Sequence, residues 1–473
     1  MSEITQSRII NVLSAMTRSE WRSFRRFIHS GVAGPVGKTL GLYDYLSEAY
    51  PDFTGSMMDK EALFSAIFPD HQYEDKKIRY ALTDFYRHAS SYLKFKALSQ
   101  YRQEGDYLLA STLEKRKAGK AYIALYNSEN YTEAEGSAEL FFHRYRKEHV
   151  HLNYFSSQVN RNITNPIGEV TRNLDLFFIT KKLQLLCEVI NVRNVMSVNY
   201  DFVFQDEILA KVSEGKFDDI PAIKIYYRII MTLTHAEDKT HFEVLQQLLF
   251  VHGSGFNNDE LRDMYQYLMN YCIKKINQGE TDFVVTLSGI YKTILDNRVI
   301  YTGSYLSQWD FKNMIVIGLR AGEKEWVHNF ILNYKTELAP DQRENAYVYN
   351  MAYYSFSIGD YRQALAQLQK VEFTDLYYQL DMRAIILKCY YETDDQVAYL
   401  YHVAAFRIFL SRNKQVSDYQ RTIYRNMIKY TTQLLRAAGN IPKIEKIQKE
   451  INEVKQIADI SWLNRKTADA LKP

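Results

Sequence analysis

The chain is poor in the residues that interrupt regular structure. Its 473 residues include 19 glycines and 8 prolines, about half of the roughly 57 that average usage would give. β-Sandwiches, barrels and propellers need a turn-forming residue about every 8–12 positions, so this shortage argues against them. It also excludes collagen-like chains and flexible Gly/Ser linkers.

Cysteine is scarce as well. Cys187, Cys272 and Cys389 lie far apart, without a CxxC pair, and each has apolar neighbours at helical spacing. An odd and sparse set does not form a disulfide framework, which fits a reducing compartment. We therefore expect three small buried hydrophobic side chains.

Long apolar runs and a dominant charge are also missing. No apolar run approaches the roughly 20 residues that span a bilayer, and the best candidate, residues 176–190, is interrupted by Lys181 and Lys182. The first residues lack the basic and apolar regions of a signal peptide. The net charge is +3 and the pI near 8.4, below the value of about 9 typical of nucleic-acid-binding domains. These features predict a soluble, cytoplasmic protein.

Aromatic residues are abundant, with 38 tyrosines and 25 phenylalanines. Many rings and few helix breakers predict an all-α protein in which long helices pack through aromatic side chains. Thr17 and Glu20 have the spacing of a capping box at the start of a helix. Six prolines lie at the ends of apolar-periodic segments, where they do not break a helix: Pro51, Pro69, Pro166, Pro221, Pro340 and Pro442.

Three joints in the second half of the chain share one spacing. In each, an Asn precedes a Gly by nine residues, an acid follows the Gly, and a small or β-branched residue comes five positions after it. The joints are Asn270/Gly279-Glu280/Val284, Asn313/Gly322-Glu323/Val327 and Asn350/Gly359-Asp360/Ala364, and Asp394-Asp395 forms a degenerate fourth.

This spacing is typical of helical hairpins. The Gly can take the left-handed conformation that closes a helix, and the acid can cap the next helix or complement its dipole. The small residue lets the second helix lie close to the first. Such hairpins cannot bury both faces alone, so neighbouring hairpins must stack.

Residues 350–371 resemble one tetratricopeptide repeat (TPR). Ala352 occupies the small position of the first helix, Phe356 the aromatic position, Gly359-Asp360-Tyr361 the turn, and Ala364 the small position of the second helix. Residues 313–334 are a weaker copy, with Ile315 at the small position and Lys324 at the tyrosine position, and residues 270–288 are weaker still. The resemblance implies a right-handed TPR-like α-solenoid with a concave face.

We predict four regions. Residues 1–100 form an N-terminal helical domain, 101–215 a helical connecting region, and 216–438 the helical-hairpin repeats. Residues 439–473 form a capping helix and tail, because Ile444, Ile447, Ile451, Val454 and Ala458 follow one helical pattern. A short dimer-forming zipper is the alternative for that segment.

Motifs that would carry chemistry are weak. Residues 31–39 look like a phosphate-binding loop, but Val32 stands where the first Gly is required, and a helix precedes the loop instead of a strand. His149 and His151 point in different directions on a helix and cannot hold one metal ion together. We therefore expect no catalytic residues, no cofactor and no metal site.

The repeats and the lack of a catalytic set favour a non-enzymatic interaction scaffold. Its concave groove would bind a peptide or helix of a partner protein. If the TPR resemblance holds, groove-facing residues include Lys312, Val316, Arg320, Tyr349, Tyr353, Phe356, Lys388 and Tyr391. Tyrosine suits such a surface because it offers both area and a hydrogen bond. The same rings equally suit a core between repeats, so the pattern leaves both assignments open.

The alternative is a nucleic-acid-associated regulator. Lys115-Arg116-Lys117 with Lys120, and Arg144-Tyr145-Arg146-Lys147, combine basic charge with rings that could stack on bases. A solvated helix face, with the Lys and Arg stems over apolar neighbours, explains the same segments. Nucleic acid is therefore the disfavoured partner, a protein or peptide the preferred one, and a membrane is not expected.

Overall fold

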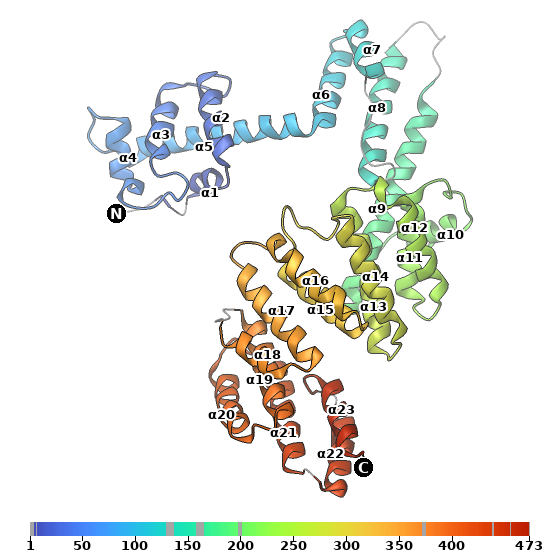
Figure 1. Ribbon diagram of the computed structural model, residues 1–473. Coiled ribbons are helices and arrows are strands. Elements are labelled where there is room, and N and C mark those ends of the chain that lie inside the picture. Colours follow the sequence, from blue (N-terminus) through green and yellow to red (C-terminus); the bar gives the residue numbers. More distant parts are fainter. Residues whose placement is uncertain are drawn as a thin grey trace. The chain divides into compact units, whose positions relative to one another are not determined.

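The structure is a computed structural model. It describes residues 4–5, 7–128, 137–157, 165–196, 201–370, 375–437, 439–454 and 456–472. Within these ranges the chain forms 23 α-helices and no β-strand (Figure 1). The predicted all-α class is confirmed.

The chain separates into two compact units. One comprises Met1–Glu133 with Ser137–Phe178, and the other comprises Ala134–Gly136 with Ile179–Pro473. Helix α9 (Ile167–Met196) contributes to both. The predicted boundaries near residues 100, 215 and 438 all fall between helices, and as domain boundaries they stay predictions.

The N-terminal helices of the first unit close around one aromatic cluster. Trp21 stacks on Tyr43 and Tyr50, with ring centroids 4.6 and 5.1 Å apart, and Phe24 is fully buried against Phe85. The capping box predicted at Thr17 is present and starts α2. The helices are α1 (Arg8–Ser14), α2 (Arg18–His29), α3 (Gly37–Ser47), α4 (Lys60–Ile67) and α5 (Asp75–Gln100), with the 3-10 turn Ser56–Met58.

Three further helices of this unit pack on one another. They are α6 (Arg102–Lys115), α7 (Gly119–Ser128) and α8 (Ala138–Ser157). Ala110, Tyr122 and Val150, one from each helix, form the buried centre of this group.

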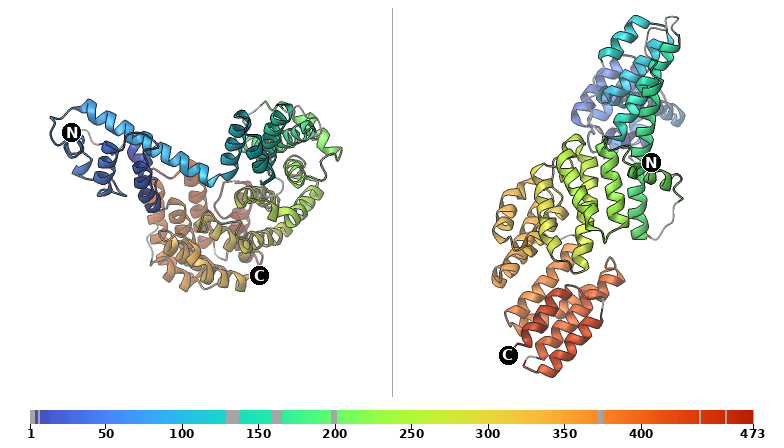
Figure 2. Two further views of the ribbon diagram at one scale, coloured as in Figure 1. Left: turned by 90° about the horizontal axis from the view of Figure 1, so that it is seen from above. Right: turned by 90° about the vertical axis from the view of Figure 1, so that its right-hand side faces the viewer.

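The second unit is a succession of helical hairpins. Each helix packs on its neighbour in the sequence, so the green to red part of the chain runs as successive helix pairs (Figure 2). From α15 onward each odd-numbered helix also packs on the next odd-numbered one. The helices are α10 (Gln205–Ser213), α11 (Pro221–Thr234), α12 (Lys239–His252), α13 (Asn258–Asn277), α14 (Asp282–Asp296), α15 (Gln308–Arg320), α16 (Lys324–Tyr334), α17 (Arg343–Ile358), α18 (Tyr361–Leu368), α19 (Leu376–Glu392), α20 (Gln396–Arg412), α21 (Asp418–Arg436), α22 (Ile441–Glu453) and α23 (Ile460–Ala470), with 3-10 turns Gly253–Gly255 and Lys335–Glu337.

Each predicted joint lies between the two helices of one hairpin. Gly279, Gly322 and Gly359 have φ values of +98°, +81° and +90°, the left-handed conformation that favours glycine. At the fourth joint Asp394 takes this conformation, with φ +52°, and Asp395 caps α20 through the Ala398 amide.

The acid after each glycine has two different roles. Asp360 caps α18 through the Gln363 amide, as predicted. The capping prediction is wrong for Glu280 and Glu323, which reach back to earlier helices. Glu280 pairs with the buried Lys275 at 3.0 Å, and Glu323 pairs with Lys292 at 2.8 Å. A glutamate side chain is one carbon longer, so it reaches these cations more readily than the adjacent amides.

The C-terminal segment differs from the single predicted helix. The pattern through Ile444, Ile447 and Ile451 forms α22, which ends at Glu453. Asp459, with φ +49°, then caps a separate helix, α23, through the amide of Trp462. Val454 and Ala458 pack on the same hydrophobic cluster from the connecting segment, so their apolar spacing reflects burial and not helix continuation.

Candidate functional site

The residues predicted to face a groove come from three helices that pack side by side. Tyr349 and Lys388 are buried and Arg320 is exposed, whereas the others are half-buried. Helix α15 carries Lys312, Val316 and Arg320, helix α17 carries Tyr349, Tyr353 and Phe356, and helix α19 carries Lys388 and Tyr391.

Lys312 lies between helices and is already neutralised. Its ammonium group pairs with Asp381 of α19, and the Tyr424 hydroxyl of α21 donates to the same carboxylate at 2.9 Å. The ammonium nitrogen lies 5.2 Å from the centroid of the Tyr349 ring. Burial, with Asp381 nearby, raises the pKa of Tyr349 and of Tyr424, which keeps their hydroxyl groups protonated.

Tyr349 belongs to the core. Its side chain is 2% exposed, and its ring meets the Tyr378 ring edge-on, with centroids 4.8 Å apart. The sequence left open whether this ring faces a groove or packs between repeats. Its burial matches packing between α17 and α19.

Lys388 forms a second bridge of the same kind. It is 4% exposed, and its ammonium nitrogen lies 2.7 Å from the Asp459 carboxylate and 4.6 Å from the centroid of the Phe356 ring. Burial pushes the pKa of Asp459 up, but Lys388, the Ser461 hydroxyl and the Trp462 amide outweigh it, so this pKa lies below its ordinary value. The carboxylate is therefore held in its charged form.

The two Lys–Asp bridges, Lys312–Asp381 and Lys388–Asp459, share one geometry. In each, a lysine passes the face of an aromatic ring on α17 and reaches an aspartate 69 or 71 residues later. The first joins α15 to α19, and the second joins α19 to the cap of α23. The bridges therefore connect odd-numbered helices that are not adjacent.

Tyr391 packs at the end of this row. Its ring meets Trp462 of α23 edge-on at 5.3 Å. The neighbouring Glu392 accepts a hydrogen bond from the Trp462 indole at 2.9 Å and pairs with Lys466 at 2.8 Å. Tyr391 and Glu392 thus tie α19 to α23.

One surface remains where the predicted residues meet solvent. Arg320 of α15 and Arg465 of α23 are exposed, and both act electrostatically on the half-buried Tyr353 hydroxyl of α17. Burial, with Asp459 and Asp381, outweighs the two arginines and raises the pKa of Tyr353 to about 12. We name Arg320, Tyr353 and Arg465 the arginine surface. It presents two exposed guanidinium groups, both near enough to the Tyr353 hydroxyl for their charge to act on its pKa.

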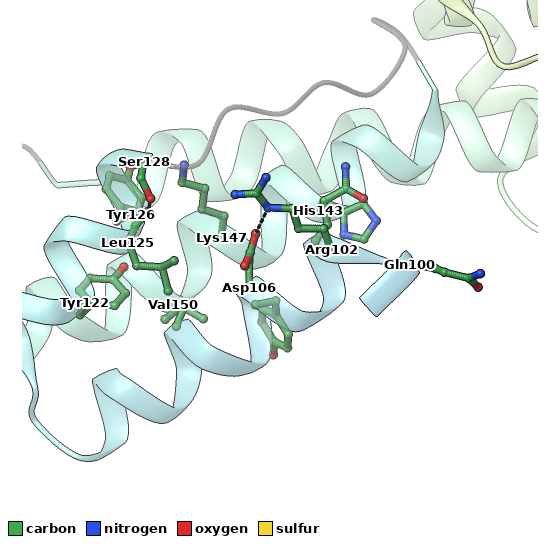
Figure 3. A pocket seen from close by; sticks show the side chains of 13 residues that line it. Gln100, Arg102, Asp106, Tyr122, Leu125, Tyr126, Ser128, His143, Lys147 and Val150 are labelled. Carbon is green, nitrogen blue, oxygen red and sulfur yellow. Dashed lines mark hydrogen bonds and ion pairs between the residues drawn. The ribbon is translucent and has the colours of Figure 1, made fainter. Parts of the chain in front are cut away.

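A separate pocket of about 410 Å³ lies among α6, α7 and α8 (Figure 3). Its lining includes Arg102, Asp106, Tyr126, His143 and Lys147. Arg102 pairs with Asp106 at 3.4 Å, and the Lys147 ammonium lies 4.5 Å from the Tyr126 ring centroid. Lys147 is thus engaged within the fold, whereas the Arg102 side chain stays largely exposed.

A partly buried polar group adjoins this pocket. The Tyr126 hydroxyl donates to Glu148 at 3.0 Å, and its ring stacks on His151 at 4.1 Å. Burial raises the pKa of Glu148 and lowers the pKa of His151. Both shifts favour the neutral side chain, so this group fits a structural role between α7 and α8.

The two basic-aromatic segments differ in exposure. Arg146 pairs with Glu104 and stacks over the Tyr107 ring, 3.6 Å from its centroid, so it is part of the packing of α6 on α8. Lys115, Arg116, Lys117 and Lys120 are exposed around the α6–α7 joint.

All three cysteines are buried and free, as predicted. Burial raises the pKa of Cys272 and of Cys389 to about 12, so these thiols are unreactive at neutral pH. Among the residues that the structure describes, no three His, Cys, Asp or Glu side chains cluster as metal ligands would.

Sequence reasoning missed Asp381, Asp459 and Arg465. The repeat length could have indicated the two aspartates, because successive joint glycines lie 43 and 37 residues apart. A residue about two repeats after a lysine therefore falls two odd-numbered helices further on, as α19 follows α15. Charge pairs at that separation could have been sought.

Comparison with known proteins identifies no relative. The chain matches no protein-family model, and no curated protein or solved structure is significantly similar to it. Across the described ranges, no helix combines the length and the apolar character needed to cross a membrane.

Proposed function

We propose that the protein is a non-enzymatic interaction scaffold, in which TPR-like hairpins form a solenoid whose groove binds a peptide or helix of a partner protein. The observation that carries the proposal is the row of odd-numbered helices α15, α17, α19, α21 and α23, each packed on the next. Such a row gives a continuous surface of the kind that solenoids use for extended ligands.

The arginine surface points to an acidic partner segment. Lys312 and Lys388 have their charges neutralised by aspartates, whereas Arg320 and Arg465 are exposed beside Tyr353. A guanidinium binds a carboxylate through two parallel hydrogen bonds, and a protonated tyrosine adds a further donor. Partner carboxylates are therefore the groups expected to contact α15, α17 and α23.

Affinity capture from native lysate tests this function. The bait is the full chain, compared with Arg320→Glu/Arg465→Glu. The matched control is Arg362→Glu/Lys446→Glu, which makes the same charge change at exposed sites on α18 and α22. We expect the captured proteins to be lost from the first variant and retained by the second.

Two further arms decide the outcome. Half of each lysate is treated with nuclease, and capture of the partner is expected to persist. A labelled Glu-rich peptide is expected to bind the wild-type chain and the control, but not the Arg320→Glu/Arg465→Glu variant. Equal binding by all three proteins, or capture that depends on nucleic acid, would contradict the proposal.

The nucleic-acid alternative rests on the exposed basic side chains at the α6–α7 joint. It predicts that Lys115→Glu/Lys117→Glu lowers binding to an oligonucleotide and that binding weakens steeply with added salt. Absence of oligonucleotide binding by the wild-type chain at low salt removes this alternative.

A further inference from the structure

Helix α20 is apolar on two opposite faces. Tyr399, Val403, Phe406 and Leu410 are buried in the C-terminal core. On the other side Val397, Leu400, Tyr401 and Ile408 are 67%, 52%, 77% and 51% exposed, with Ala404 and Ala405 exposed between them. A helix that is hydrophobic all round is normally buried all round.

The exposed side chains form one stripe. Val397, Leu400, Tyr401, Ala404 and Ile408 follow the i, i+3, i+4, i+7, i+11 spacing of a helix-packing seam. The large side chains of Leu400 and Tyr401 occupy the N-terminal half of the stripe, and the small Ala404 follows them before Ile408. The stripe is therefore raised at Leu400 and Tyr401 and recessed at Ala404.

An antiparallel second copy of α20 fits this stripe. Turning the helix about a two-fold axis midway between Val397 and Ile408 places Tyr401 against Ala404 of the second copy. The same rotation places Val397 against Ile408. At the centre of the seam the large Tyr401 then meets the small Ala404, as close helix packing requires, and at each end Val397 meets Ile408.

The charges at the two ends of α20 match the same pairing. Asp394 and Asp395 lie exposed at its N-terminal end, and Arg412 and Lys414 at its C-terminal end. Asp394 and Arg412 also lie on one side of the stripe. In an antiparallel pair each Asp394 lies within about one turn of the partner copy's Arg412, and opposite helix dipoles lie side by side.

We propose that the exposed face of α20 is a homodimer interface, in which two copies of the chain pair antiparallel through this helix. The surface area that one pair of 17-residue helices can bury is smaller than the roughly 1,200–2,000 Å² that a stable interface buries. The monomer and dimer should therefore exchange in a concentration-dependent way. The face lies on an even-numbered helix, so the proposal does not depend on the groove of the odd-numbered row.

Sedimentation equilibrium of the full chain over a wide concentration range gives the first test. We expect a monomer–dimer equilibrium, which Leu400→Asp weakens at least about tenfold and Ala404→Tyr weakens by closing the recess for Tyr401. Val285→Asp, at an exposed site of α14, is the matched control and should not change association. Circular dichroism checks that each variant remains helical.

Charge exchange tests the direction of pairing. Arg412→Glu should weaken the dimer, and Asp394→Arg/Arg412→Glu should restore it, because the two-fold axis recreates both contacts with reversed sign. Cysteine pairs give an independent measure. Val397→Cys/Ile408→Cys should form a disulfide-linked dimer on mild oxidation, whereas neither single variant should, since identical positions lie about 16 Å apart along the axis.

Three results would overturn the proposal. They are a monomer at every concentration, a dimer that Leu400→Asp and Ala404→Tyr leave intact, and cross-linking of either single cysteine variant at the same rate as the double variant. The first would leave the apolar face to another partner, the second would place the interface elsewhere, and the third would show parallel pairing.

Discussion

The N-terminal helices α1–α5 and the hairpins from α15 to α23 are both rich in rings, but they hold together differently. In the first, aromatic side chains converge on one cluster around Trp21 and Phe24. In the second, rings alternate with lysines whose aspartate partners lie on helices further along the chain. Aromatic residues thus form a closed core in one region and pack against charged Lys–Asp bridges in the other.

The difference follows from shape. Five helices around a centre can bury the rings that face it against one another, so hydrophobic burial dominates their packing. A row of hairpins has no common centre, and each hairpin packs mainly on its neighbours. A charged pair between non-adjacent helices then adds directional specificity that apolar contact does not supply.

The largest expected effect is loss of a ring from the closed core. Phe24→Ala removes a fully buried side chain that contacts Phe85 and Tyr92, and should cost about 3–5 kcal/mol. Urea unfolding of the full chain measures the loss. Hydrogen exchange should place it in α1–α5, and an equal loss of protection in α15–α23 would refute independence of the two regions.

Removal of one charge from a bridge should have a smaller effect. Lys388→Met keeps most of the side-chain volume but leaves Asp459 without its cation, at an expected cost of about 1–3 kcal/mol. Lys388→Met/Asp459→Asn should recover most of this loss, because Asn still caps α23.

Thermal and urea unfolding measure both variants. Lys446→Met, at an exposed site on α22, is the control and should stay within about 0.5 kcal/mol of the wild type. If the double variant is no more stable than Lys388→Met, charge pairing is not what Lys388 contributes.

Acid should weaken the same bridge gradually. The pKa of Asp459 is lower in the folded chain than its unfolded value of about 4. Its stabilising contribution is therefore complete above about pH 4 and is lost as the pH falls through the folded-state pKa. The stability difference between the wild type and Lys388→Met/Asp459→Asn, followed from pH 7 to pH 3, should shift against the wild type. A difference that does not change with pH would contradict this linkage.

The smallest effect concerns the fourth hairpin joint. Asp394 has the left-handed conformation that glycine takes at the other three joints, so Asp394→Gly should stabilise the chain by about 0.5–1 kcal/mol. Gly359→Asp, the reverse change, should destabilise it. Thermal unfolding of both variants measures the pair, and effects of the same sign would show that φ is not the deciding factor.

Local features of the fold could be predicted from the sequence. The capping box at Thr17, the closing glycines and the cap at Asp360 each depend on residues a few positions apart, so their spacing carries the information. The all-α class follows from the same local signals.

Contacts that span two hairpins could not be assigned. The local sequence does not show whether Lys312 and Lys388 face a groove or are buried. The aspartates that pair with them stand 69 and 71 residues away. Tyr349 and Tyr353 are four residues apart on one helix, yet the first is buried and the second half-buried. Helical periodicity says that they share a face, and only the packing of α19 on α17 separates them.

The span of the Lys–Asp bridges also sets an order of assembly during synthesis. At about 5–20 residues per second, Asp381 leaves the ribosome roughly 3–14 s after Lys312. Tyr349 follows Lys312 about halfway through that interval, so the lysine gains the ring before it gains its anion. Lys388 is likewise synthesised before its partner Asp459, which stands 71 residues later. The bridge from α15 can therefore close only after α19 has been synthesised, and the bridge from α19 only after the segment that begins α23 has followed.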